Sequence, residues 1–257
     1  MKKAKCNKRK SLIILVLFAL CLSFFNLSCG LDVLAIVLAD PCTPSHTPDV
    51  GFQYDELYYG FTINKLDNAN DFGQTSVYYK IYNDLSKASS EEATLISASE
   101  DSERRYNSVS IMIDQYGYKE LHYLDALSGK SKSFNLSNDS HTVWIRLTNY
   151  DDTSEEFSAG IIVDGELLGI PLRLNGKTFD FGRKGENDEN PSVNIGDANA
   201  SDSDTKGFVE KQAEGKENIY YVVMFSVFEM LNDSYEPVYS PIHRLGRVEI
   251  NANEEKN

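Results

Sequence analysis

Residues that form covalent or metal cross-links are scarce in this sequence. Only four cysteines and four histidines occur among 257 residues. Because the imidazoles of His46, His122, His141 and His243 are scattered along the chain, we expect no zinc site and no cofactor. The Gly-x-Ser-x-Gly turn that carries the nucleophile of many hydrolases is also missing. The sequence therefore predicts no catalytic residue.

Basic residues are also few relative to acidic residues. Lys and Arg number 25 against 39 Asp and Glu, which gives a formal net charge of −14. Six of the basic residues lie within the first ten positions, and without them 19 remain, for a net charge of −20. Such a surface repels phosphate backbones and anionic headgroups, so we expect no nucleic-acid partner.

Two short motifs resemble ligand-binding loops but are incomplete. Gly129-Lys130-Ser131 matches the end of a phosphate-binding loop, yet Leu124 stands where the first glycine is required. Oxygen-bearing residues alternate from Asp197 to Ser201 as in a calcium loop, but Asp202 and Phe208 replace the required Gly and Glu. We expect a polar turn at the first motif and a solvated acidic loop at the second.

A long apolar run is found only near the start of the chain. The six basic residues precede the run from Leu12 to Phe25, whose 14 residues are fewer than the roughly 20 that span a bilayer. A basic end followed by a short apolar helix is typical of an export signal. We therefore interpret residues 1–28 as a signal peptide.

The end of this signal resembles the lipobox of bacterial lipoproteins. Leu27 and Ser28 precede Cys29, although Asn26 occupies the position where that pattern places Leu. Relaxed boxes of this kind, and the Ser-Cys-Gly-Leu-Asp start, look like those of spirochaetal lipoproteins. The resemblance implies cleavage before Cys29, a diacylglycerol on its sulfur and an acylated amine, hence an exported protein anchored in the cell membrane or outer membrane.

Two alternatives for the N-terminus remain open. Val37-Leu38-Ala39 before Asp40 has the small-residue pattern of an ordinary cleavage site, which would release a soluble secreted protein. An uncleaved anchor helix from Leu12 to Ala39 is disfavoured, because Asp32 would cost about 2.5–3.5 kcal/mol at its centre.

Lipidation would leave Cys42 as the single cysteine of the exported chain, so an intrachain disulfide is not expected. Residues 29–50 are punctuated by Pro41, Pro44 and Pro48 and are predicted to form a flexible tether. Residues 51–250 are predicted to form the folded domain, and residues 251–257 a solvated tail.

Alternating apolar and polar residues indicate β-strands through most of the folded domain. The predicted segments are Leu57–Ile63, Val77–Tyr82, Tyr118–Leu124, Thr142–Leu147 and Val238–Ile250, with Ile219–Phe228 as a central strand covered on both faces. Asp164-Gly165 and Asn175-Gly176 are predicted as tight hairpin turns. Residues 84–118 are predicted as a partly helical insertion and the acidic residues 182–218 as a disordered loop.

This pattern predicts a mainly β fold, a modified β-sandwich with one or two short helices after the N-terminal signal helix. Leu57–Ile63 with Val77–Tyr82 looks like the B and C strands of fibronectin type III or immunoglobulin-like domains, with Phe61 where such domains often carry Trp. The region from Tyr221 to Pro241 looks like their F and G strands.

Because no catalytic motif is found, the outward faces of the predicted strands are the candidate functional surfaces. Tyr78, Lys80 and Tyr82 share one face of their strand, and Trp144 and Arg146 share one face of theirs. Such faces either pack beneath a neighbouring element, which is the interpretation we favour, or contact a protein or glycan partner. We expect a non-enzymatic binding or interaction module, with an envelope hydrolase using paired carboxylates as the alternative.

Overall fold

In a computed structural model, the described residues are 41–67, 73–150, 156, 158–181, 198–210, 212–215, 218–232 and 234–252. The chain divides into two units, Met1–Val37 and Leu38–Asn257, and all described residues belong to the second. The predicted signal peptide and Cys29 lie outside the described residues, as do residues 182–197 of the acidic loop and 253–257 of the tail. Within the described ranges no helix has the length and apolar character needed to cross a membrane.

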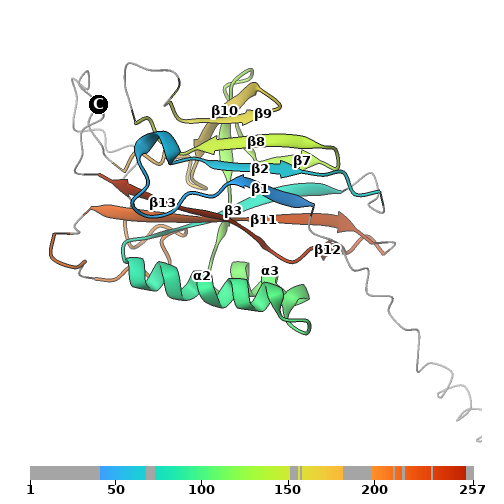
Figure 1. Ribbon diagram of the computed structural model, residues 1–257, viewed down its shortest axis with the longest axis horizontal. Coiled ribbons are helices and arrows are strands. Elements are labelled where there is room, and N and C mark those ends of the chain that lie inside the picture. Colours follow the sequence, from blue (N-terminus) through green and yellow to red (C-terminus); the bar gives the residue numbers. More distant parts are fainter. Residues whose placement is uncertain are drawn as a thin grey trace, which may run out of the picture. The chain divides into compact units, whose positions relative to one another are not determined.

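Two antiparallel sheets form the frame of the folded unit, as expected for a β-sandwich (Figure 1). Sheet A has seven described strands in the order β1-β2-β8-β9-β10-β5-β6. Their bounds are Cys42–His46, Tyr59–Ile63, His141–Arg146, Gly160–Val163, Glu166–Leu172, His122–Asp125 and Ser131–Ser133. The Asp164-Gly165 hairpin is confirmed, since both residues have positive φ angles and join β9 to β10. At Asn175-Gly176 the chain turns, but the structure assigns no strand to the residues that follow.

Sheet B is built around one long strand. It contains β12, β11, β3 and β4 in that order, with β13 also pairing with β11 and β7 with β3. Their bounds are Pro237–Tyr239, Ile219–Leu231, Gln74–Tyr82, Lys119–Glu120, His243–Asn251 and Asn135–Ser137. The side chains of β11 are buried along nearly its whole length, which confirms the predicted central strand.

The insertion between β3 and β4 is helical, as predicted. Helix α2 spans Leu85–Glu100. Asp84 is its N-cap, and its carboxylate accepts a hydrogen bond from the Lys87 backbone N–H. A 3₁₀ turn, the short helix α3 (Ser108–Ser110) and a π turn over Ile111–Gln115 follow it. A further 3₁₀ turn, Tyr54–Glu56, precedes β2.

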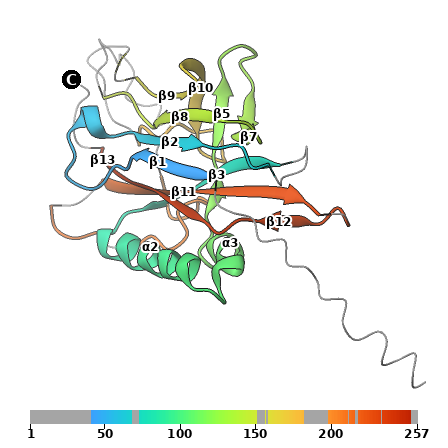
Figure 2. The ribbon, with the colours of Figure 1, turned by 45° about the vertical axis from the view of Figure 1, so that its right-hand side comes forward.

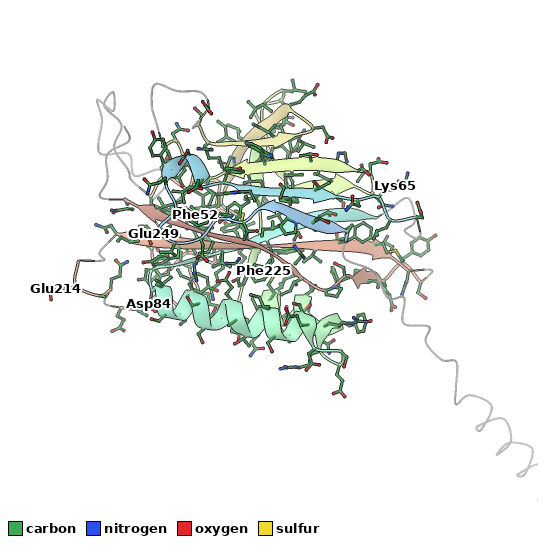
Figure 3. All side chains as sticks on the ribbon, in the orientation of Figure 1. Phe52, Lys65, Asp84, Glu214, Phe225 and Glu249 are labelled. Atoms are coloured by element: carbon green, nitrogen blue, oxygen red, sulfur yellow. The ribbon has the colours of Figure 1, made fainter. Side chains whose placement is uncertain are left out.

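Two large apolar cores lie in this three-layer arrangement (Figure 2), and a small third cluster contains Phe228 and Met230 of β11. The first lies between the sheets and includes Phe61 of β2 and Tyr79 of β3. The second lies between sheet B and the helices, where Figure 3 labels Phe225 of β11. Phe225 belongs to one cluster with Ala88 and Leu95 of α2. Sheet B is therefore covered on both faces, whereas the described helices leave the outer face of sheet A open.

The predicted tether is wrong for its C-terminal part. Cys42–His46 is not a flexible segment but strand β1, paired antiparallel with β2. This strand lies at the edge of sheet A, where the missing N–H of Pro44 costs no ladder hydrogen bond on the outer side. The edge position explains why a proline-rich segment could join the sheet.

The predicted disordered loop is likewise wrong for residues 198–210. This segment is ordered, and Asp204 and Thr205 within it are almost fully buried. Ala198 and Phe208 pack against the core between the sheets, whereas the segment is otherwise polar and acidic. Its polar residues contact Arg173, directly after β10 of sheet A, and β3 of sheet B.

Candidate functional site

The phosphate-loop motif lies in a hairpin turn. Gly129-Lys130-Ser131 leads from β5 into β6 instead of from a strand into a helix, and Gly129 has a φ of 62°. Asp125 closes this turn, accepting hydrogen bonds from the Ser128 backbone N–H at 2.6 Å and from Lys132 Nζ at 2.5 Å. The hydrogen bonds with Lys132 and Ser128 hold the pKa of Asp125 well below its usual value. The motif thus has the geometry of a polar turn.

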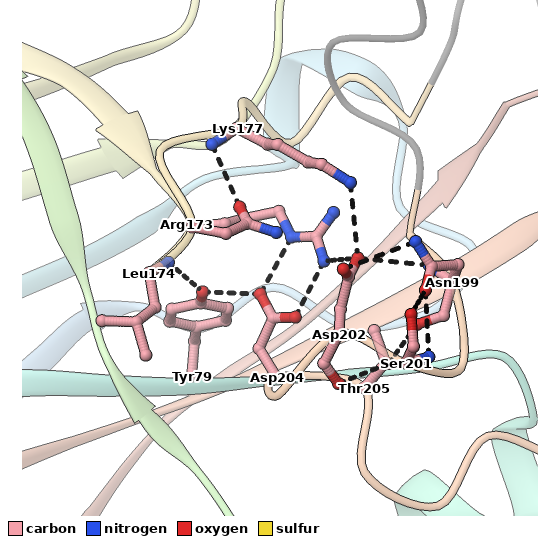
Figure 4. A network of polar contacts seen from close by, with 10 residues as sticks. Tyr79, Arg173, Leu174, Lys177, Asn199, Ser201, Asp202, Asp204 and Thr205 are labelled. Atoms are coloured by element: carbon pink, nitrogen blue, oxygen red, sulfur yellow. Dashed lines mark hydrogen bonds and ion pairs between the residues drawn. The ribbon is translucent and has the colours of Figure 1, made fainter.

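The acidic segment is held by one buried arginine, Arg173, at the end of β10 (Figure 4). Its guanidinium donates to both carboxylate oxygens of Asp204, at 2.9 and 2.8 Å, and to Asp202 at 2.6 Å. Tyr79 of β3 donates its hydroxyl to Asp204 at 2.7 Å and accepts the Leu174 backbone N–H at 2.8 Å. Burial and the neighbouring Asp204 raise the pKa of Tyr79 far above its ordinary value, so it remains a donor.

Of the residues that resembled a calcium loop, Asp197 lies outside the described residues, and Asn199 and Ser201 hydrogen-bond within their own segment. Asn199 accepts the backbone N–H of Ser201, and its own backbone carbonyl accepts the hydroxyl of Thr205 at 2.5 Å. Burial opposes ionisation of Asp202, but hydrogen bonds from Arg173 and from the Asn199 backbone N–H prevail and lower its pKa. Across the described residues, no three His, Cys, Asp or Glu side chains are grouped so as to hold a metal ion. We interpret this network as an anchor for residues 198–210.

The predicted Tyr78, Lys80 and Tyr82 face is covered by helix α2. Lys80 is 1% exposed, and its Nζ lies 2.6 Å from Glu91 of α2 and 4.7 Å from the ring centre of Tyr82. Desolvation lowers the pKa of Lys80, and the hydrogen bond with Glu91 partly offsets this shift. The Tyr82 hydroxyl also donates to Glu91, at 2.9 Å. The structural interpretation of this face is therefore confirmed.

The Trp144 face is different, because it lies open on sheet A. Trp144 is 45% exposed, whereas its neighbours Val143 and Ile145 point into the core between the sheets. Other large apolar side chains accompany it on β5, β9 and β10. They are Leu124, Ile162, Leu167 and Ile170. Among the described strands of sheet B, none exposes a large apolar side chain.

Three aromatic rings stack face to face in a row on this face of sheet A. His46 of β1 stacks on Tyr58 with ring centres 4.0 Å apart, and Tyr58 stacks on Trp144 at 4.6 Å. The planes differ by 18° and 17°, so the rings are nearly parallel. His46 is fixed in turn by a 2.7 Å contact between its Nε2 and the Glu56 carbonyl. The row orders the aromatic side chains in a single arrangement before any ligand arrives.

A hollow of about 820 Å³ begins where the row of rings ends. We call it the Trp144 pocket. It is lined by Asp55, Tyr58, Trp144, Arg146, Glu156, Ser158, Ala159, Gly160, Ile162 and Leu167. Strand register explains the assembly, since Trp144 of β8 lies opposite Ile162 of β9, which lies opposite Leu167 of β10. This volume falls in the range of about 300–1,000 Å³ that small-molecule sites occupy.

Arg146 shapes one wall of the pocket. Its side chain is 9% exposed and donates hydrogen bonds to the backbone carbonyls of Tyr54 at 3.1 Å and Asp55 at 3.2 Å. Burial lowers the pKa of Arg146, but its guanidinium stays charged because the ordinary pKa of arginine lies far above neutral pH. Arg146 thereby fixes the turn that brings Asp55 to the pocket.

Sequence reasoning identified Trp144 and Arg146 but missed Tyr58, Gly160, Ile162 and Leu167. A signal for the last two was present, because the correctly predicted Asp164-Gly165 turn folds β9 and β10 against each other. Pairing the two strands across that turn places Leu167 opposite Ile162. Tyr58 and Gly160 carried no such signal, since their place depends on the pairing of β2, β8 and β9.

Comparison with known proteins adds no assignment. No family model matches this chain, and no curated protein and no solved structure is significantly similar to it.

Proposed function

We propose that this protein is a lipid-anchored binding module of the bacterial cell envelope, tethered through Cys29 and without enzymatic activity. The lipobox-like residues around Cys29 support the anchor. The unequal exposure of the two sheets is the observation that carries the binding role. Sheet B is buried between sheet A and the helices, whereas the outer face of sheet A exposes a cluster of large apolar side chains beside the Trp144 pocket. Exposed apolar clusters of this kind mark interaction sites.

Anchoring is tested by replacing the cysteine that would carry lipid. We expect the wild-type protein in the membrane fraction, with an intact mass that includes acyl chains on an N-terminal Cys29. Cys29→Ser should lack the acyl mass. The bond before residue 29, which the lipoprotein pathway would cleave in the wild type, should stay uncleaved. Cys42→Ser is the matched control, because Cys42 is buried in β1 and its acylation is not expected. A mass difference no larger than the exchange of sulfur for oxygen, with equal partitioning of Cys29→Ser and wild type, or a mature N-terminus at Asp40, would rule out the anchor.

A further inference from the structure

The indole of Trp144 has one covered and one uncovered face. Strand β8 lies between β2 and β9, and Tyr58 stacks on the indole from the β2 side. Trp144 also lines the Trp144 pocket, together with Ile162 of the neighbouring strand β9. It meets no second aromatic ring among the described residues, which agrees with its 45% exposure. An ordered, flat apolar wall is thus available to a ligand.

Gly160 keeps the floor of the pocket open. It lies opposite Arg146 in the strand register, in the same outward row of β9 as Ile162. A Cβ at this position would lie 3.2 Å from Leu167 Cδ1, so any larger side chain would project into the space that Leu167 borders. Because Gly160 does not have a positive φ angle, its backbone does not require glycine. Glycine at this position therefore leaves the space beside Leu167 unfilled.

The polar groups of the pocket suit hydroxyl groups. Asp55 and Glu156 supply carboxylates, and Arg146 supplies one positive charge. Carboxylates accept hydrogen bonds from hydroxyl donors, whereas two acids against one base disfavour an anionic ligand. The net charge of −14 adds to that repulsion. A ligand that fits must combine an apolar flat face with several neutral hydroxyls.

We infer that the Trp144 pocket binds one or two pyranose rings of a neutral glycan, with the C–H face of a ring on the free indole face and its hydroxyls toward Asp55 and Glu156. This inference rests on the proposed binding function and names its ligand class. Trp144 contacts the sugar, and Arg146 acts as a positioning residue through the 54–56 turn. The aromatic wall and the few convergent polar groups are the usual composition of small-ligand sites.

The test uses Trp144 itself, because it is the only tryptophan of the chain. The intact protein is titrated with glucose, galactose, N-acetylglucosamine and glucuronate while indole fluorescence is recorded, and is applied in parallel to a glycan array. We expect saturable blue shifts with at least one neutral sugar and no response to glucuronate. Gly160→Thr, which fills the floor but keeps the indole, should weaken binding by about tenfold or more. Ile170→Ala, on the same face outside the pocket, should bind as wild type does.

Trp144→Phe gives a second variant, followed by array binding because its indole is gone, with circular dichroism to verify folding. Loss of neutral-glycan binding in Gly160→Thr and Trp144→Phe supports the inference. Binding that survives both substitutions, or an equal response to glucuronate, would overturn it. A blue shift with apolar peptides but with no sugar would also overturn it while leaving the binding module intact. The proposed anchor would fail separately, through the absence of acyl mass on Cys29.

Discussion

A single buried guanidinium connects a polar stretch of chain to the fold. Arg173 is 0% exposed, and its charge is balanced by Asp204 and Asp202, which come from a segment about thirty residues further along the chain. Asp204 is 1% exposed. Without the guanidinium, a buried carboxylate would lose most of its hydrogen bonds. Removing one partner of such a pair costs about 3–5 kcal/mol, far more than the pair adds over an apolar replacement.

Arg173→Met should therefore lower the free energy of unfolding by about 3–5 kcal/mol. The measurement is urea unfolding followed by circular dichroism. Lys177→Met is the matched control, because its Nζ also approaches Asp202, at 3.6 Å, but is 31% exposed. An ion pair at that exposure contributes about 0–1 kcal/mol. Similar losses in the two variants would show that burial of the guanidinium does not set the stability of this segment.

At the scale of elements, the edge between β10 and β5 depends on one glycine. Gly169 lies opposite Asp125 and next to the register shift between Leu167 and Gly169. A Cβ at Gly169 would overlap the Leu124 carbonyl oxygen and lie 2.8 Å from Tyr123 Cδ2. The backbone of a neighbouring strand cannot move aside as the end of a flexible side chain can. The approach of β5 to β10 thus requires the absence of a side chain.

Gly169→Ala is expected to destabilise the protein by about 1–3 kcal/mol or more through overpacking. Gly160→Ala, in the adjacent strand, meets only Leu167 Cδ1 at 3.2 Å and should cost much less. Thermal unfolding of the two variants compares the positions directly. Equal stability of Gly169→Ala and Gly160→Ala would show that the approach of β5 to β10 does not require glycine at position 169.

The elements also show where sequence reasoning succeeds and fails. The strands around Phe61 and Tyr79 were predicted because one side of each carries a regular apolar pattern, and β11, which contains Val223, because both its sides do. Strand β1 was not predicted, since its pairing with β2 compensates for a sequence that favours no strand. Pairing is a long-range property that composition does not reveal.

The candidate site was predictable only in part, for the same reason. Trp144 and Arg146 alternate on one strand, so their common face follows from the sequence. The pocket beside them requires Tyr58, Gly160 and Leu167 from three other segments. The Asp164-Gly165 turn indicates that the segments of Gly160 and Leu167 meet, but nothing in the sequence indicates that Tyr58 lies beside them. Likewise, Asp204 was taken for part of a solvated loop because its partner Arg173 lies 31 residues earlier.

For the whole molecule, the N-terminal boundary of the folded unit is a consequence of β1. This strand covers the edge of β2, and Asp49 after it pairs with Arg247 of β13 at 2.7 Å. The Pro48 carbonyl also accepts the Arg247 backbone N–H, at 2.9 Å. Residues 42–49 therefore tie both sheets together, and the tether predicted to reach residue 50 would end before Cys42.

Chains that begin at Asp40 and at Gly51 distinguish these boundaries. The first keeps β1 and should unfold cooperatively at the temperature of the longer chain. The second loses β1 and the contacts of Asp49, so it exposes the unpaired edge of β2, from which chains associate. We expect it to unfold at a lower temperature and to aggregate in light-scattering measurements. Equal unfolding temperatures without aggregation would return residues 41–50 to the tether, whereas the expected difference would assign them to the domain that presents the Trp144 pocket.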